Sequence, residues 1–209
     1  MQKIKVFISY YHLEDQGFKE TLSNHLAYDN ELEDASVSLG DISDELTDEQ
    51  IRQKIRDEYI KDSDVFVLLC GKNTRHRKHI DWEIHAAMYK SDVKKPLPII
   101  VINVDENNNY MRVSDYDINK YFKDLYYRNS MNSAYSAYLY NQNERILPER
   151  ILSSITKYKC PITVLPLKSV YSNWTRFGEF IESVYNNRTN FIYDDSSVLR
   201  RRNGENEWY

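Results

Sequence analysis

The first residues of the chain alternate between two faces, as a β-strand requires. Ile4, Val6 and Ile8 share one of these faces, and β-branched residues at every second position favour a strand. The alternation ends at Ser9, before a more polar segment. We therefore predict that residues 4–9 form a buried first strand.

Segments with helical and with strand periodicity then follow in turn. Thr47 precedes Gln50 by three residues in a capping-box pattern, and apolar residues recur at helical spacing after it. Residues 65–70 are apolar without interruption, which is typical of a central parallel strand covered on both faces. The patterns predict helices over residues 15–26, 48–61, 80–89 and 173–185, and further strands over residues 35–39, 65–70, 98–104 and 162–165.

Strands that alternate with helices along the chain predict a doubly wound α/β fold with right-handed crossovers. The expected architecture is a flavodoxin-like parallel sheet of five strands, with an insertion over about 105–158 before the last strand. One domain over residues 1–185 accounts for these elements. The tail over residues 186–209 contains Arg200, Arg201 and Arg202 and is expected to be a solvated or partly disordered end.

Composition excludes several classes of protein. The 28 basic and 32 acidic residues are spread along a chain of 209 residues, so no basic footprint indicates a nucleic-acid partner. No apolar stretch is long enough to span a bilayer, and the first residues lack the pattern of a signal peptide. We expect a cytoplasmic protein without a membrane partner, in which Cys70 and Cys160 serve as small buried hydrophobic residues.

Familiar catalytic and cofactor motifs are missing from the sequence. Five glycines do not form the GxGxxG of a dinucleotide fold or the GxxxxGK[ST] of a phosphate loop. Neither HExxH, paired cysteines of zinc spacing nor a GxSxG nucleophile elbow occurs. We therefore expect neither a metal nor a bound cofactor.

Ligands of open α/β sheets bind beyond the carboxyl ends of the strands. The segments that follow the first three strands are residues 9–12, 40–44 and 71–74. Glu83 comes soon after, near the start of the helix that follows the central strand, on the flank of its apolar stripe. A carboxylate in a first helical turn is also favoured by the helix dipole. By spacing alone, a structural role for Glu83 therefore ranks ahead of a catalytic one.

Three blocks of sequence resemble the TIR-like domains of the Thoeris anti-phage defence system. They are KVFISYYHLEDQ at 5–16, SDELTDEQIRQKIRDEYIKDSDVFVLLCGKNT at 43–74 and RKHIDWEI at 77–84. The resemblance implies an enzyme that consumes NAD as its substrate and requires Glu83. Nicotinamide leaves, and the ADP-ribose is cyclised into a cyclic ADP-ribose isomer that activates a separate effector protein. The resemblance further implies a phage-derived trigger and self-assembly.

Seven further residues are expected to bind the substrate. Aromatic rings could stack on nicotinamide or adenine, hydroxyl and imidazole groups could reach ribose or phosphate oxygens, and the loop after the second strand belongs to the site in TIR domains. The expected aromatic walls are Tyr10, Tyr11 and Trp82, the expected polar contacts are Ser9 and His12, and the expected loop residues are Asp41 and Ser43.

Two other functions remain open at the level of sequence. A non-catalytic TIR adaptor would use residues 40–47 as an interface and would tolerate Glu83→Gln. An enzyme similar to nucleoside deoxyribosyltransferases would share the sheet topology and would exchange bases on deoxynucleosides without acting on NAD.

Overall fold

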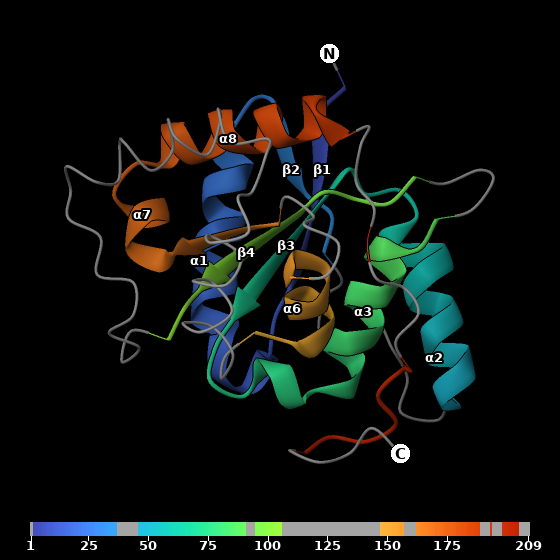
Figure 1. Ribbon diagram of the computed structural model, residues 1–209. Helices are drawn as coiled ribbons and strands as arrows, with labels where there is room; N and C mark the ends of the chain where they lie inside the picture. Colours follow the sequence, from blue (N-terminus) through green and yellow to red (C-terminus); the bar gives the residue numbers. More distant parts are fainter. Residues whose placement is uncertain are drawn as a thin grey trace.

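The computed structural model describes residues 2–36, 46–90, 95–105, 147–156, 162–188, 193 and 198–204. Within this part of the chain, five parallel strands form one sheet in the order β2-β1-β3-β4-β5 (Figure 1). This arrangement confirms the predicted doubly wound, flavodoxin-like α/β fold. The strands are β1 (Ile4–Ser9), β2 (Leu32–Asp34), β3 (Val65–Cys70), β4 (Ile99–Asn103) and β5 (Thr163–Pro166).

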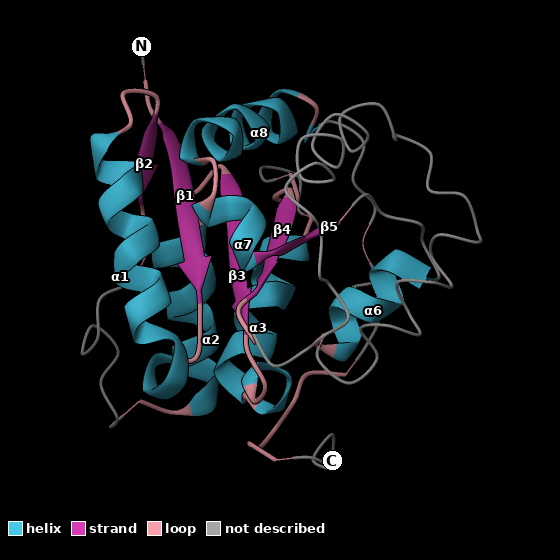
Figure 2. Cartoon of the chain, turned by 90° about the vertical axis from the view of Figure 1, so that its left-hand side faces the viewer, coloured by secondary structure: helices cyan, strands magenta, loops and turns pink. Residues whose placement is uncertain are grey.

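Helices cover both faces of the sheet, and each face has its own hydrophobic cluster. Figure 2 shows α7 and α8 in front of the sheet, on the side of α1, with α2 and α3 behind it. One face is covered by α1 (His12–Tyr28), α7 (Leu167–Tyr171) and α8 (Trp174–Asn186), and the other by α2 (Asp48–Lys54), a π-helix (Ile55–Ile60), α3 (Lys78–Met88) and α6 (Glu149–Thr156).

The alternation along β1 decides which face each side chain meets. Val6 and Ile8 belong to the cluster under α1 and α8, whereas Phe7 belongs to the cluster under α3. The Phe7 ring stacks on Phe66 of β3 with centroids 5.6 Å apart. Because side chains two residues apart share a face, Ser9 is directed with Phe7 toward α3.

The predicted helices and four of the predicted strands are confirmed to within a few residues. Thr47 forms the expected capping box, since its hydroxyl accepts the Gln50 N–H and the Gln50 side chain accepts the Thr47 N–H. The helix predicted over residues 48–61 continues past α2 as the π-helix. Cys70 is fully buried at the end of β3, as expected, whereas Cys160 lies outside the described residues.

The second strand begins earlier than predicted, because β2 lies at Leu32–Asp34 and residues 35 and 36 follow it without strand structure; the rest of the predicted range, residues 37–39, lies outside the described residues. Leu32 fills the cluster under α1 and fixes the register of β2 against β1. The Asp34 carboxylate then accepts the N–H of Ser36 at 2.8 Å, a local turn that ends the strand. The burial of Leu32 therefore outweighs the apolar alternation that follows it in sequence.

Two features near the end of the chain also differ from expectation. The short α7 was not predicted. The helix α6 agrees with the expected insertion of helices and loops over residues 105–158, most of which falls outside the described residues. The expectation of a solvated tail is wrong for Arg200, which is buried, and holds for Arg201 and Arg202, which are exposed. None of the helices described here is long and apolar enough to cross a membrane.

Candidate active site

The carboxylate of Glu83 meets the carboxyl end of β1. Ile80, Ile84 and Ala87 bury the inner face of α3 against the sheet, which places Glu83 on the edge of that face. Ser9 is 1% exposed, and its hydroxyl donates to Glu83 Oε2 at 2.6 Å. The structure therefore brings together two of the residues expected at the site from sequence.

Burial raises the pKa of Glu83 from 4.5 to about 7, while the hydrogen bond from Ser9 lowers it. The apolar surroundings thus disfavour the charge more than the hydroxyl stabilises it. A carboxyl group with such a pKa is present in both protonation states near neutral pH. Perturbed carboxyl groups at the carboxyl edge of a parallel sheet are a common property of functional sites.

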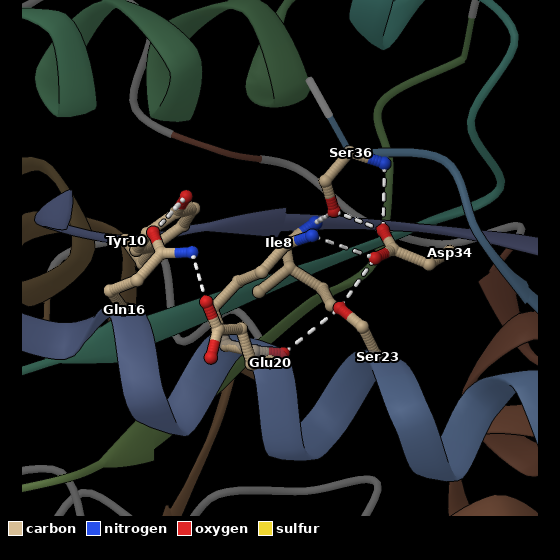
Figure 3. A network of polar contacts seen from close by, with 8 residues as sticks. Ile8, Tyr10, Gln16, Glu20, Ser23, Asp34 and Ser36 are labelled. Carbon is tan, nitrogen blue, oxygen red and sulfur yellow. Dashed lines mark hydrogen bonds and ion pairs between the residues drawn. The ribbon is translucent and has the colours of Figure 1, made fainter. Parts of the chain in front are cut away.

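Tyr10 is directed to the other face of the sheet. Its hydroxyl donates to Gln16 Oε1 of α1 at 2.8 Å, and its ring packs against the cluster under α1. Figure 3 shows this contact beside a polar network in which Asp34 accepts hydrogen bonds from Ser23 and Ser36. Burial raises the pKa of Tyr10, and the negative charge of Glu83 raises it further.

Tyr11 lies on the α3 side of the sheet and is half-buried. The guanidinium carbon of Arg77 lies 3.9 Å from the centre of its ring, so a cation is stacked on the aromatic face. His12 is the first residue of α1 and is exposed, with its ring edge-on to Tyr11 at 5.8 Å. Tyr11, unlike Tyr10, is therefore on the same face of the sheet as Glu83.

Trp82 is buried. Its indole N–H donates to the carbonyl oxygen of Arg200 at 2.8 Å, and the charged groups of Arg52 and Lys78 lie 5.3 Å and 5.1 Å from its ring. The structure thus joins the indole to the C-terminal segment, while the neighbouring Glu83 is joined to β1. The expected contacts from Asp41 and Ser43 lie outside the described residues.

A second carboxyl group near the ends of the strands was not identified from sequence. Asp15 is 3% exposed, and its Oδ2 lies 3.5 Å from the hydroxyl of Thr74. That hydroxyl accepts the N–H of Gly71, the residue that follows β3, at 2.8 Å. Burial raises the pKa of Asp15 from 3.8 to about 6. Asp15 precedes Leu22 by seven residues on the buried stripe of α1, and this spacing was a signal for its burial.

A buried ion pair beside the site was also missed. The guanidinium of Arg150 in α6 donates to Asp81 of α3, with Nε 3.1 Å from Oδ1 and Nη2 3.3 Å from Oδ2. Arg150 is 0% and Asp81 4% exposed. Asp81 immediately precedes Trp82 in α3, so this pair anchors the helix that carries Glu83.

The arrangement at Glu83 suits the stabilisation of a developing positive charge. A carboxylate held by one hydroxyl in apolar surroundings interacts with a cation more strongly than it would in water. The described residues contain no group of three or more His, Cys, Asp and Glu side chains that could hold a metal ion.

Comparison with known proteins indicates the family of the segment that carries this site. Residues 7–109 match the model of the family described as "Thoeris protein ThsB, TIR-like domain". A solved structure of the TIR domains of the activated Roq1 resistosome, which directly recognises the pathogen effector XopQ, matches with 13% identity and a TM-score of 0.41. The match covers 88% of this chain and 99% of that chain. No curated protein matches the sequence. The segment that carries Ser9 and Glu83 belongs to the family of TIR-like domains of the Thoeris protein ThsB.

Proposed function

We propose that this protein cleaves NAD at the nicotinamide glycosidic bond and cyclises the remaining ADP-ribose into a signal. Glu83 is the catalytic residue, and NAD is a substrate rather than a resident cofactor. The observation that carries the proposal is the partly buried Glu83 carboxylate held by Ser9 at the carboxyl edge of the sheet. The match of residues 7–109 to the Thoeris TIR-like family supports the same function and a role in anti-phage defence.

The chemistry requires one carboxylate with an unusual environment. When the bond between the ribose carbon and the nicotinamide nitrogen breaks, positive charge develops on the ribose. Glu83 in its ionised form stabilises this charge more in the transition state than in the bound substrate. The leaving nicotinamide carries the positive charge in NAD and departs as a neutral molecule, so no general acid is needed, unlike in ordinary glycoside hydrolysis.

Cyclisation requires that a nucleophile within the same ADP-ribose reaches the ribose carbon before water does. Exclusion of water from the pocket favours this outcome. Tyr11 lies on the α3 face of the sheet and is the aromatic residue that we expect to stack on the substrate. The cyclic ADP-ribose isomer then activates a separate effector protein in the cytoplasm, after a phage-derived trigger and self-assembly have completed the site.

Infected bacteria provide the decisive test, because infection supplies the trigger. We would express wild type, Glu83→Gln and the control Glu179→Gln, which alters an exposed glutamate on α8. Lysates are searched by mass spectrometry for nicotinamide and for cyclised ADP-ribose. We expect both products with wild type and control, and neither with Glu83→Gln. If defence depends on the protein while all three lysates lack the products, the non-catalytic adaptor is the correct function.

A further inference from the structure

The N-terminus of α3 is completed by a residue from the far end of the chain. The side chain of Arg77, at the N-cap position, has only donor groups and cannot accept a helix N–H. Instead, Asn203 Oδ1 accepts the N–H of Lys78 at 2.9 Å across a separation of 125 residues. A side-chain oxygen therefore caps α3, but it comes from residues 198–204, which we call the strap.

The strap also closes a buried network around Asp81. The N–H of Arg200 donates to Asp81 Oδ2 at 2.9 Å, beside the two donors from Arg150. Arg150 Nη2 donates in addition to the carbonyl oxygen of Val198 at 3.3 Å. Arg200 is 3% exposed. The carboxylate of Asp81 thus ties α3 to both α6 and the strap.

Two more contacts hold the strap against α3 and against the short 3-10 helix, Thr74–His76, that precedes it. The Trp82 indole donates to the Arg200 carbonyl oxygen at 2.8 Å, and the N–H of Gly204 donates to the His76 carbonyl oxygen at 3.0 Å. Figure 1 shows the C-terminal segment returning to lie beside α3. The strap therefore contacts α3 at its first turn and at the two residues that precede Glu83.

We propose that the strap and Arg150 position α3 so that Glu83 meets Ser9, and that Asp81, Arg150 and Asn203 are positioning residues for catalysis. The inference rests on the proposed function of Glu83. Ser9 is fixed by the sheet, whereas Glu83 depends on where α3 lies. A loosened helix end shifts the carboxylate relative to Ser9, and a displacement of about 1 Å costs on the order of 100-fold in rate.

Asn203 offers a test that leaves the core intact. Asn203→Ala removes the cap, whereas Asn203→Asp keeps an acceptor oxygen and places a favourable negative charge at the helix start. Arg202→Ala is the matched control, since Arg202 is exposed in the same strap. We expect exchange of the α3 amides to become about five-fold faster in Asn203→Ala, and to stay as in wild type in the other two variants.

Activity is measured on the same full-length variants as nicotinamide release from NAD in lysates of infected cells. We expect a several-fold lower kcat with little change in KM for Asn203→Ala, and rescue by Asn203→Asp. The kcat of Asn203→Ala should also rise at lower pH than in wild type. Burial raises the Glu83 pKa more than the Ser9 hydrogen bond lowers it, so a carboxylate that moves toward water has a lower pKa even without that bond. Arg150→Lys keeps the charge but loses the paired donors, and should act in the same direction.

The two readouts separate this inference from the proposed function. If the α3 amides exchange at the same rate in Asn203→Ala and in wild type, the strap does not hold α3 and the inference is wrong, independently of the enzyme's activity. Faster exchange with unchanged kcat overturns its role in catalysis. If wild type releases no nicotinamide, the proposed function fails, and the amide exchange alone decides whether the strap positions α3.

Discussion

Replacement of Arg150 by methionine should destabilise the fold more than any exposed substitution. The change leaves the Asp81 carboxylate buried with the Arg200 N–H but without the two guanidinium donors. Removing one partner of a buried ion pair costs about 3–5 kcal/mol, because the remaining charge is uncompensated. That is a large part of the ~5–15 kcal/mol that stabilises a typical domain.

The same reasoning predicts how a second change compensates for the first. Asp81→Asn removes the charge but keeps an oxygen that can accept the Arg200 N–H. The double variant Arg150→Met with Asp81→Asn should therefore be more stable than the sum of the two single losses predicts, by about 2 kcal/mol. Such a difference is the coupling that a double-mutant cycle isolates.

Urea unfolding followed by circular dichroism measures these free energies. Wild type, both single variants and the double variant are compared at one pH, and equal m-values show that the unfolding transitions are comparable. Exposed Arg201→Met serves as the control and should change stability by less than about 0.5 kcal/mol. A loss below about 1 kcal/mol for Arg150→Met, or additive losses in the double variant, would refute the argument.

Three further predictions concern Glu83, Ser9 and Gly71. The pKa of Glu83 is about 7 in the folded protein and 4.5 in the unfolded chain. Between these pH values the folded state binds the proton more tightly, so the free energy of unfolding falls as pH rises. Glu83→Gln removes this slope and should raise stability at pH 8 by about 2–3 kcal/mol, measured by urea unfolding at several pH values; equal slopes in both proteins would contradict it. Ser9→Ala removes the hydrogen bond that lowers the Glu83 pKa, so the kcat of nicotinamide release should rise at higher pH than in wild type, and an unshifted profile would count against the contact. Gly71→Ala would place a Cβ 2.7 Å from Asp15 Oδ1 and should destabilise the fold by about 1–3 kcal/mol in thermal unfolding, whereas Gly17→Ala, in open space on α1, should not.

Local patterns in the sequence were sufficient to predict four of the five strands and the position of Glu83. The uninterrupted apolar run of β3 and the capping box at Thr47 act over a few residues, and the structure confirms both. The expectation that Glu83 lies on the flank of the apolar stripe of α3 also agrees with its contact to Ser9. These features depend on periodicity, which a single sequence displays directly.

Contacts between distant residues could not be predicted in this way. Arg150 meets Asp81 across 69 positions, and Trp82 meets Arg200 across 118. Nothing near Arg200 distinguishes it from Arg201 and Arg202, yet only Arg200 is buried. An arginine is buried only where its partners already lie in the interior, and those partners belong to other elements.

The cap on α3 sets an order of events during protein synthesis. Chains fold from the N-terminus as they leave the ribosome, so β1, α1 and β3 can assemble early. The N–H of Lys78 gains its acceptor only when Asn203, 125 residues later in the chain, has been synthesised. A nascent chain therefore carries Glu83 long before its helix is secured. The contacts of the strap with α3 are therefore complete only after translation has passed Asn203.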